Sequence, residues 1–500
     1  MNKFLSKTKS KKLVRLFCVF LVFVCVASCL IGCSGDYQLN KVSKDLVTYI
    51  IEAGFDETEM VVSGVQEVVF NNTTNQTLKE LRFHLYPNAY RQGVQNPVVS
   101  PIKAQDAYPN GYDYGCIDIE YAKQEGSDLP FSIGGEEQNI LILPLMEELP
   151  SGKSTTVEIS FETELANINH RLGYGEHTVN LNHWFPILCK FQDGEWLQDV
   201  YSCVGDPFVM DVANFKVALT VNDYDIATSG DVINQTITDQ QTRYELCANA
   251  VRDFSIIMSK NFEVIQKEVD GVQVKYYYFD GVDAQPDEIL ELSCRALKYF
   301  NDKFGKYPYK TLSVVQSDFN EGGMEYSRLA MVTYGLDKDF YKQAVVHEIA
   351  HQWWCCVVGN DQIRNAWMDE GLAEYSTHLF FCDNDFGIDA IEEMKLSKKR
   401  LHDYLEITKN YFKQVDTSLN RSLKEYRNQT EYSYLNYVKS MIMFDDVCQL
   451  MGKNKFLRAL KNYYDDNKFA LATPKDLIDS FSFAFGSDMT KVFEEYILGQ

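Results

Sequence analysis

The chain of 500 residues lacks an excess of basic residues, Cys-x-x-Cys pairs, internal repeats and the motifs of nucleotide-binding proteins and serine hydrolases. Its 48 lysine and arginine residues are outnumbered by 71 aspartate and glutamate residues, and the net charge of −23 argues against a nucleic-acid partner. None of the 13 cysteines forms a Cys-x-x-Cys pair, so a cysteine-rich metal site is not indicated. There are no internal repeats, phosphate-binding loops or Ser-His-Asp signatures. The remaining composition, 45% hydrophobic and 24% charged, is that of a globular protein long enough for two domains.

The most informative segment has the pattern His-Glu-x-x-His and begins at His347. On an α-helix, His347 and His351 lie on one face and can reach a single metal ion. Glu348 then lies where the general base for a water molecule is needed. Glu370 follows after eighteen intervening residues and can supply a third ligand, leaving one coordination position open as in a catalytic zinc site. The alternative is a buried amphipathic helix whose histidines satisfy polar groups of the core.

The flanking sequence predicts the helices that carry these residues. We expect one buried helix from Lys342 to Val358, ended by Gly359. A second helix, over residues 373–381, is expected to direct Glu370 back towards the first.

These residues resemble a known family, the gluzincin aminopeptidases, which include alanyl aminopeptidase, aminopeptidase N and leukotriene hydrolase. Gly322-Gly323-Met324-Glu325-Tyr326 is similar to the family's Gly-x-Met-Glu-Asn exopeptidase motif, and Tyr437-Val438-Lys439-Ser440 is similar to its Tyr-x-Lys-Gly segment. The resemblance covers about residues 55 to 500. Further matching segments are His347–His351, Trp353–Trp354, Trp367–Tyr375, Arg252–Phe254 and Tyr307–Tyr309.

The resemblance implies hydrolysis of a peptide bond with one zinc ion per chain, held by His347, His351 and Glu370. Zinc polarises the scissile carbonyl and lowers the pKa of its water. Glu348 is implied to be the general base, and Tyr437 to donate a hydrogen bond to the tetrahedral oxyanion. Tyr437 also fits a buried core tyrosine, because the local match departs from the family where serine replaces the glycine of its motif.

The glycine-rich motif bears on specificity. The resemblance implies that Glu325 binds the free α-amino group of the substrate, so that one residue is removed at a time. Gly322, Gly323 and Met324 are expected to contact the substrate, the glycines because they allow close backbone approach. Tyr326 stands where well-known members carry asparagine, which weakens the inference of strict aminopeptidase action. The alternative is a surface turn with a solvated glutamate.

Three further polar residues are candidates for supporting roles. Glu374 lies four residues after Glu370 and can orient a ligating histidine, or it can be a solvated or capping charge. Family members use a second polar group from the N-terminal lobe to bind the amine. Asn180 and Asn182 are the candidates for that role.

The N-terminus has the pattern of a secretory leader. Residues 1–15 carry six basic and no acidic side chains, and residues 16–32 are almost entirely apolar. Leu30-Ile31-Gly32-Cys33 resembles a bacterial lipobox, which predicts a lipid anchor on Cys33 at the outer face of the membrane; Cys29 is a weaker match. An uncleaved membrane anchor or an ordinary signal peptide is the alternative.

Hydrophobic patterning predicts an α+β multidomain protein. We expect a leader at residues 1–32, a tether at 33–55 and an N-terminal β-rich domain at 56–255, where Val157, Ile159 and Phe161 alternate with more polar residues. Residues 256–500 are expected to form a mostly helical, thermolysin-like catalytic domain, with a helix starting at Pro286. By resemblance, the β-rich domain is a saddle or sandwich that walls the cleft.

Three functions are consistent with these observations. The first is a cell-surface zinc aminopeptidase acting on peptides, and the second is a zinc endo- or oligopeptidase without strict amino-terminal preference. The third is a binding protein on an inactive peptidase fold. Inactive versions would be expected to lose the base or a metal ligand, and here all of these residues are present.

Overall fold

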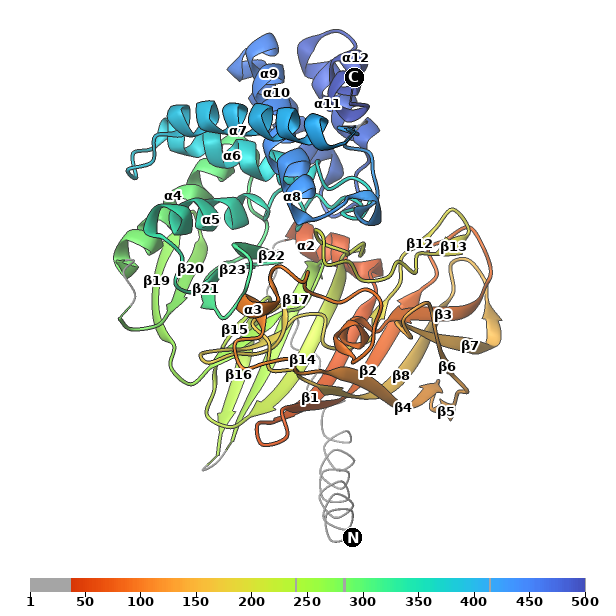
Figure 1. The fold of residues 1–500 in the computed structure, drawn as a ribbon. Coiled ribbons are helices and arrows are strands. Elements are labelled where there is room, and N and C mark those ends of the chain that lie inside the picture. Colours follow the sequence, from red (N-terminus) through yellow and green to blue (C-terminus); the bar gives the residue numbers. More distant parts are fainter. Residues whose placement is uncertain (1–36, 239–240, 282–284, 413–414, 500) are drawn as a thin grey trace.

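The computed structural model describes residues 37–499 except 239–240, 282–284 and 413–414. The leader expected at residues 1–32 and the lipobox cysteines Cys29 and Cys33 therefore lie outside the described residues. Among the helices that are described, none combines the length and the apolar character needed to cross a membrane. The described chain forms a β-rich lobe and a mostly helical lobe that lie one above the other in Figure 1.

The β-rich lobe contains three principal sheets and a small two-stranded one. The largest sheet has eight strands in the order β16-β17-β14-β1-β2-β8-β4-β5, and two four-stranded sheets have the orders β15-β18-β10-β9 and β11-β3-β7-β6. The strands of the largest sheet are β1 (Thr48–Asp56), β2 (Val61–Asn71), β4 (Cys116–Gln124), β5 (Ser127–Asp128), β8 (Ser154–Glu164), β14 (Ala213–Val221), β16 (Asp231–Ile237) and β17 (Thr242–Val251). The others are β3 (Leu78–His84), β6 (Ser132–Gly134), β7 (Ile140–Leu149), β9 (Leu172–Tyr174), β10 (Val179–Leu181), β11 (Ile187–Leu188), β12 (Phe191–Gln192), β13 (Glu195–Trp196), β15 (Asp225–Thr228) and β18 (Ile256–Ser259).

Alternation of apolar and polar residues explains the largest sheet. Val157, Ile159 and Phe161 of β8 are buried, as the sequence pattern predicts for a half-buried strand. Strand β14 follows the same rule, because every second side chain from Ala213 to Val221 is buried. One face of this sheet therefore packs on the core of the lobe.

The stretch expected to be a tether contains the strand β1. Thr48–Asp56 pairs with β14 on one side and with β2 on the other, so it lies inside the eight-stranded sheet. The tether expected up to residue 55 is therefore wrong for its second half. The physical reason is a second alternating pattern, in which Tyr49, Ile51 and Ala53 are buried and their neighbours are partly exposed.

The helical lobe begins with a five-stranded mixed sheet in the order β19-β20-β21-β23-β22. Its strands are β19 (Glu263–Val269), β20 (Val272–Tyr278), β21 (Thr311–Ser317), β22 (Gly323–Tyr326) and β23 (Leu329–Thr333). The helices are α4 (Pro286–Lys303), α5 (Lys338–Ala350), α6 (Asp369–Asp383), α7 (Ala390–Tyr411), α8 (Gln429–Tyr432), α9 (Ser440–Met451), α10 (Lys453–Asn467), α11 (Pro474–Phe485) and α12 (Thr490–Ile497). Helices α4 and α5 pack on the sheet, and β22 is its edge strand. The helix predicted to start at Pro286 is confirmed.

Helix α5 is shorter than the sequence predicts. It ends at Ala350 with His351 as its C-cap, whereas a helix to Val358 was expected. The chain turns after His351 and places Cys355 at φ +135°, a backbone region that side chains other than glycine rarely adopt. Gly359 therefore does not end this helix. The regular spacing of apolar residues up to Val358 reflects burial of the turns and not a continuous helix.

Arg252 connects the two lobes and explains the glycine at position 359. Its buried guanidinium donates hydrogen bonds to three backbone carbonyls, those of Met210 (2.6 Å), Cys355 (2.9 Å) and Ala470 (3.2 Å). A Cβ on Gly359 would lie 2.3 Å from the Arg252 Cζ atom, so glycine leaves the space that the guanidinium occupies. The turn after α5 is thus fixed by a residue about one hundred positions earlier in the chain.

Candidate active site

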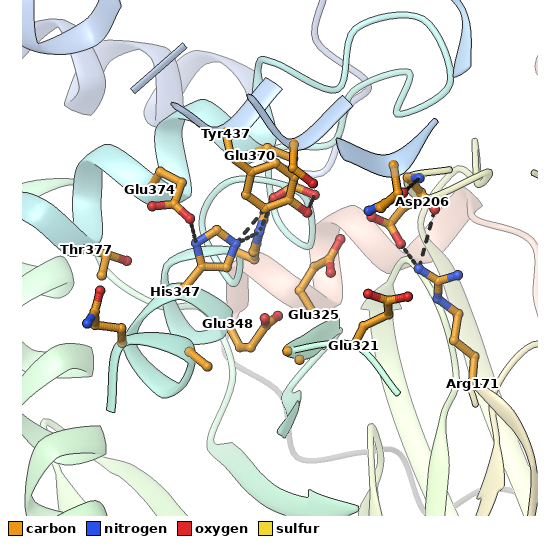
Figure 2. A pocket seen from close by; sticks show the side chains of 18 of the residues that line it. Arg171, Asp206, Glu321, Glu325, His347, Glu348, Glu370, Glu374, Thr377 and Tyr437 are labelled. Atoms are coloured by element: carbon orange, nitrogen blue, oxygen red, sulfur yellow. Dashed lines mark hydrogen bonds and ion pairs between the residues drawn. The ribbon is translucent and has the colours of Figure 1, made fainter. Parts of the chain in front are cut away.

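Helices α5 and α6 bring His347, His351 and Glu370 together, as Figure 2 shows for the residues it labels. One ligand atom from each residue lies within 4.8 Å of the others. The Nε2 atoms of the two histidines are 2.9 Å apart, and each is 3.3 Å from Oε2 of Glu370. All three residues are buried.

The hydrogen bonds around the two imidazoles indicate what this triad is built to hold. His351 Nδ1 lies 2.9 Å from the carbonyl oxygen of Trp354, so Nδ1 carries the proton and Nε2 presents a lone pair. His347 Nδ1 lies 3.4 Å from a carboxylate oxygen of Glu374, which favours the same tautomer. Two lone pairs then converge on a carboxylate oxygen of Glu370 that has no hydrogen-bond partner in the described structure. A divalent cation with nitrogen and oxygen preferences fits this donor set.

Charges in the site shift its titrating groups in opposite directions. Burial opposes ionisation of Glu370, but the close approach of His347 and His351 outweighs burial and lowers the pKa of the Glu370 carboxyl. Burial would lower the pKa of His351, but the carboxylates of Glu325, Glu370 and Glu348 raise it well above its usual value. The lowered pKa of Glu370 favours its negative form, and the raised pKa of His351 reflects the negative charge around it. A site with this excess of negative charge favours a bound cation.

Glu348 lies beside the triad and depends on a glycine for its position. A carboxylate oxygen of Glu348, one of Glu325 and a ring nitrogen of His351 lie within 4.8 Å of one another. A Cβ on Gly323 would lie 2.4 Å from Oε1 of Glu348, so the glycine leaves room for this carboxylate. Burial raises the pKa of Glu348 well above its usual value. Gly323 was expected to admit the substrate backbone, and the structure shows that it also accommodates Glu348.

Tyr437 reaches the site from a short π-helix, η4 (Ser433–Lys439). Its hydroxyl donates a hydrogen bond of 2.5 Å to Oε1 of Glu370, and its ring stacks near that of His347 with centroids 5.8 Å apart. Wider turns of this kind often occur at functional sites. Ser440, which replaces the family's glycine, is the first residue of α9 and donates its hydroxyl to the Asn436 carbonyl of the π-helix.

Glu325 lies on the edge strand β22, and its carboxylate accepts a hydrogen bond from the side-chain amide of Gln362. Gln362 Nε2 donates hydrogen bonds of 2.9 Å to Oε1 of Glu325 and to Oδ2 of Asp369. Asn360 donates to the other oxygen of Asp369 at 2.9 Å. Burial, with nearby carboxylates, raises the pKa of Glu325 to about 8, and burial raises that of Asp369 to about 7. The sequence gives no signal for Gln362, since it lies in an irregular segment.

Of the other residues in the glycine-rich motif, some line the cavity and others are buried behind it. Gly322 and Gly323 line the cavity, but Met324 and Tyr326 are buried and do not. The Met324 sulfur accepts a hydrogen bond of 3.3 Å from Nε of Arg171. Met324 is therefore placed to support an arginine of the other lobe.

The two lobes enclose a cavity of about 290 Å³ above these residues. The β-rich lobe contributes Arg171 and Asp206, which form a buried ion pair, and Arg171 Nη1 also donates to the Tyr201 hydroxyl at 3.0 Å. Burial raises the pKa of Asp206 to about 6, and Arg171 opposes this shift. The other residues that this lobe contributes are Val98, His170, Cys203 and Gly205.

Asn180 and Asn182, the expected amine-binding residues, do not line the cavity. The Asn180 amide donates to the carbonyls of His170 and Asp318, both at 2.9 Å, and Asn182 donates to the Arg171 carbonyl. They are structural residues that shape the segment carrying Arg171.

The sequence analysis did not identify Arg171 and Asp206, because neither lies in a motif. For Asp206, the sequence does contain one indication of a functional residue: it is a charged residue within the apolar stretch Val204-Gly205-Asp206-Pro207-Phe208.

The fold and the site together describe a two-lobed chain whose candidate metal ligands lie on two consecutive helices, α5 and α6. Residues 288–496 match the model of the peptidase family M1 domain. This match, which covers the helical lobe, supports the resemblance of the sequence to the gluzincin aminopeptidases.

Individual relatives are distant and mostly longer. Aminopeptidase N of Lactobacillus helveticus is 24% identical over 414 residues, which cover 76% of this chain and 46% of that protein. Mitochondrial aminopeptidase 2 of Saccharomyces cerevisiae is 24% identical over 309 residues, 58% of this chain and 30% of that protein. The chain thus spans less than half the length of either relative. The crystal structure of an M1 zinc metallopeptidase from Deinococcus radiodurans shares the fold, with a TM-score of 0.65 at 15% identity, covering 91% of this chain and 94% of that one.

Proposed function

We propose that this protein is a zinc-dependent aminopeptidase that removes N-terminal residues from peptides. The observation that supports this most directly is the position of Glu325, whose carboxylate lies within 4.8 Å of ligand atoms of Glu348 and His351. A carboxylate at a fixed, short distance from the metal site pairs with a substrate ammonium group and leaves room for one residue before the scissile bond.

His347, His351 and Glu370 would hold the zinc ion, because two neutral imidazoles and a carboxylate form a set of three protein ligands with an open position. When bound, zinc supplies Lewis acidity, which polarises a carbonyl group and lowers the pKa of a water molecule. Glu374 keeps the His347 ring in the ligating orientation through Nδ1.

The protein's own residues supply the proton transfers and the charge stabilisation. Glu348 accepts the proton of the attacking water on its carboxylate and passes it to the leaving amine. The Tyr437 hydroxyl donates to Glu370 in this structure, and it would transfer this hydrogen bond to the oxyanion that forms on the substrate carbonyl. Because the groups sit in a cavity closed by both lobes, bulk water is partly excluded and these electrostatic effects are strengthened.

The substrate ammonium would be bound by two carboxylates, one from each lobe. Glu325 is fixed by Gln362, and Asp206 by Arg171, so neither has to be ordered when the substrate binds. Asp206 thereby takes the role for which Asn180 and Asn182 were considered.

The test compares aminoacyl coumarin amides with their N-acetylated counterparts, before and after removal of metal with a chelator. An aminopeptidase cleaves the free amines, fails on the acetylated compounds and recovers when zinc is restored. Equal cleavage of both series would instead establish a peptidase without amino-terminal preference, and no cleavage of any substrate by the zinc-loaded protein would favour a binding role.

We also propose that Cys33 carries a lipid anchor at the outer face of the cell membrane. The basic residues 1–15, the apolar residues 16–32 and the lipobox-like Leu30-Ile31-Gly32-Cys33 support this. Membrane fractionation of a Cys33→Ala variant tests it; an unchanged membrane fraction would contradict it.

A further inference from the structure

We propose that Glu321 makes the enzyme selective for peptides whose first residue is basic, by pairing with the ammonium or guanidinium group of that residue's side chain. This inference rests on the proposed aminopeptidase function and names its substrate class. Four observations carry it: the fixed position of Glu321, the direction of the substrate, the balance of charge in the cavity and the apolar surface beside it.

Glu321 lies two residues before the edge strand β22 and is held there by the neighbouring strand β23. The Thr333 hydroxyl donates to the backbone carbonyl of Glu321, and the Thr333 amide donates to that of Gly322 at 3.1 Å. The side chain lines the cavity, and Figure 2 shows its carboxylate between Glu325 and Arg171. The carboxylate is therefore presented to the cavity by a backbone that is already ordered.

The direction of the substrate places its first side chain near Glu321. The α-amino group lies at Glu325, and the scissile carbonyl lies at His347 and its partner ligands. Glu374 and Thr377 lie on one side of His347 in Figure 2, and Glu321 lies on the other, beyond Glu325. Because the rest of the peptide must continue away from its amino end, it runs towards Glu374, and the first side chain is left with the region around Glu321.

The balance of charge in the cavity leaves Glu321 as the acidic group without a committed partner. The acidic residues that line the cavity are Asp206, Glu321, Glu325, Glu348, Glu370 and Glu374. Five of them already have a role. Asp206 pairs with Arg171 and, together with Glu325, binds the substrate amine. Glu348 transfers the proton, Glu370 would hold the metal and Glu374 contacts His347.

Glu321 itself has weak support from the protein. Its Oε1 accepts one long hydrogen bond, 3.4 Å, from the Asn320 amide, and no basic side chain of the described residues lies within 4.0 Å of it. Burial raises the pKa of Glu321, and the more distant charges of Lys103 and Arg171 oppose this shift. A partly buried carboxylate in this situation gains most from a cation brought by the ligand.

The neighbouring surface suits the stem of a basic side chain. Val98 also lines the cavity, so the methylene groups of lysine or arginine can lie on apolar surface while the charged end reaches Glu321. Arginine has the additional advantage of a planar group that can donate two parallel hydrogen bonds to one carboxylate.

The experiment compares arginyl and citrullyl coumarin amides, which have nearly the same shape but differ in charge. We expect the zinc-loaded wild-type enzyme to prefer arginine in kcat/KM by about tenfold or more, as for a hydrogen-bonded charge pair. Glu321→Gln should bring this ratio close to one, and Glu321→Lys should invert it. Asp106→Asn, which removes an exposed carboxylate near the cavity, is the matched control and should keep the wild-type ratio.

The possible outcomes distinguish failure of the role of Glu321 from failure of the proposed aminopeptidase function. Wild-type turnover of both substrates with a ratio near one overturns the role of Glu321 and leaves the aminopeptidase function standing. The same holds if Glu321→Gln keeps the wild-type ratio. If neither these nor other aminoacyl amides are cleaved by zinc-loaded protein, the proposed function itself fails. Should Glu321→Gln fold poorly in thermal melting, the wild-type ratio and Glu321→Asp, which keeps the charge and should keep the preference, still decide.

Discussion

The two walls of the cleft are built in different ways. In the helical wall, the reactive residues His347, Glu348 and Glu370 lie on the regular helices α5 and α6, within a short stretch of sequence. In the β-rich wall, Arg171 and Asp206 lie in irregular segments between strands. Helices fix side chains precisely, which suits bond-making groups, whereas loops vary in length and shape, which suits the recognition of different substrates. Changes on helices α5 and α6 should therefore affect turnover and metal binding, and changes in the β-rich wall should affect substrate binding.

The largest effect is expected from Glu348→Gln in the helical wall. Loss of the carboxylate removes the proton acceptor, so kcat should fall by about 100- to 10,000-fold while KM changes little. Metal content, measured by mass spectrometry, should stay at the wild-type level because Glu348 is not a ligand. A variant that keeps its turnover would exclude Glu348 from the proton transfer.

Gly323→Ala should nearly reproduce that loss without touching an ionisable group. Its Cβ would lie 2.4 Å from Oε1 of Glu348, and a displacement of about 1 Å can cost on the order of 100-fold in rate. Steady-state kinetics gives the result. Gly54→Ala is the control, since a Cβ there meets nothing within 4 Å, and equal rates in both variants would show that Gly323 has no such role.

Glu374→Gln should weaken the metal site and not the chemistry. Without the carboxylate 3.4 Å from Nδ1, the His347 ring is less firmly oriented, and the affinity for zinc should fall by about 10- to 100-fold. Competition with a fluorescent chelator measures this affinity, and excess zinc should restore activity. Glu392→Gln, on the exposed surface of α7, serves as the control. Unchanged affinity in Glu374→Gln would mean that the histidine needs no such support.

Asp206→Asn tests the β-rich wall. Removing one of the two amine-binding carboxylates should raise KM for aminoacyl substrates by about tenfold, with a smaller change in kcat. Asp211→Asn, in the same segment but exposed and paired with Lys190, is the matched control. If the loss falls on kcat and spares KM, the division of labour between the two walls is wrong.

The smallest effect concerns stability and pH in the β-rich lobe. His183 stacks on Phe208 with centroids 3.9 Å apart, and burial lowers its pKa to about 3. The unfolded chain, with a histidine pKa of about 6.5, binds the proton more readily, so this residue destabilises the fold as pH falls below that value. Its contribution between pH 7 and pH 5 is about 2 kcal/mol of unfolding free energy.

A His183→Gln variant isolates this contribution. Urea unfolding at pH 7 and at pH 5 should show a smaller loss of stability on acidification than in the wild-type protein. His402→Gln, at an exposed position of α7, should follow the wild-type pH dependence. Identical pH dependence in all three proteins would show that His183 is not the cause.

The contrast between the walls also explains what could be predicted from sequence. The candidate ligands of the helical wall could be predicted because the spacing of His347 and His351 is a local property that a helix converts directly into geometry, and Glu370 follows at the start of the next helix. Apolar alternation located β8 for the same reason. The site residues Arg171 and Asp206 were not found, since their approach depends on how distant strands pack.

Two errors have a related physical cause. The helix expected up to Val358 ends at Ala350 because Arg252, far away in sequence, binds the carbonyl of Cys355 and holds the turn. The strand β1 was taken for a tether because its short alternation follows a polar segment, and pairing with β14 decides its structure. Local pattern is insufficient where long-range contacts determine the backbone.

The three carbonyls bound by Arg252 belong to the β-rich lobe, the turn after α5 and the segment after α10. Loss of structure in the helical half would leave the buried Arg252 cation without two of its three partners, and loss of structure in the β-rich half would remove the cation from those two carbonyls. We therefore expect the protein to melt in a single cooperative transition, with no surviving fragment of either half. For the same reason, opening and closing of the cleft cannot rely on a hinge at this junction, and substrate must exchange through movements of the rim.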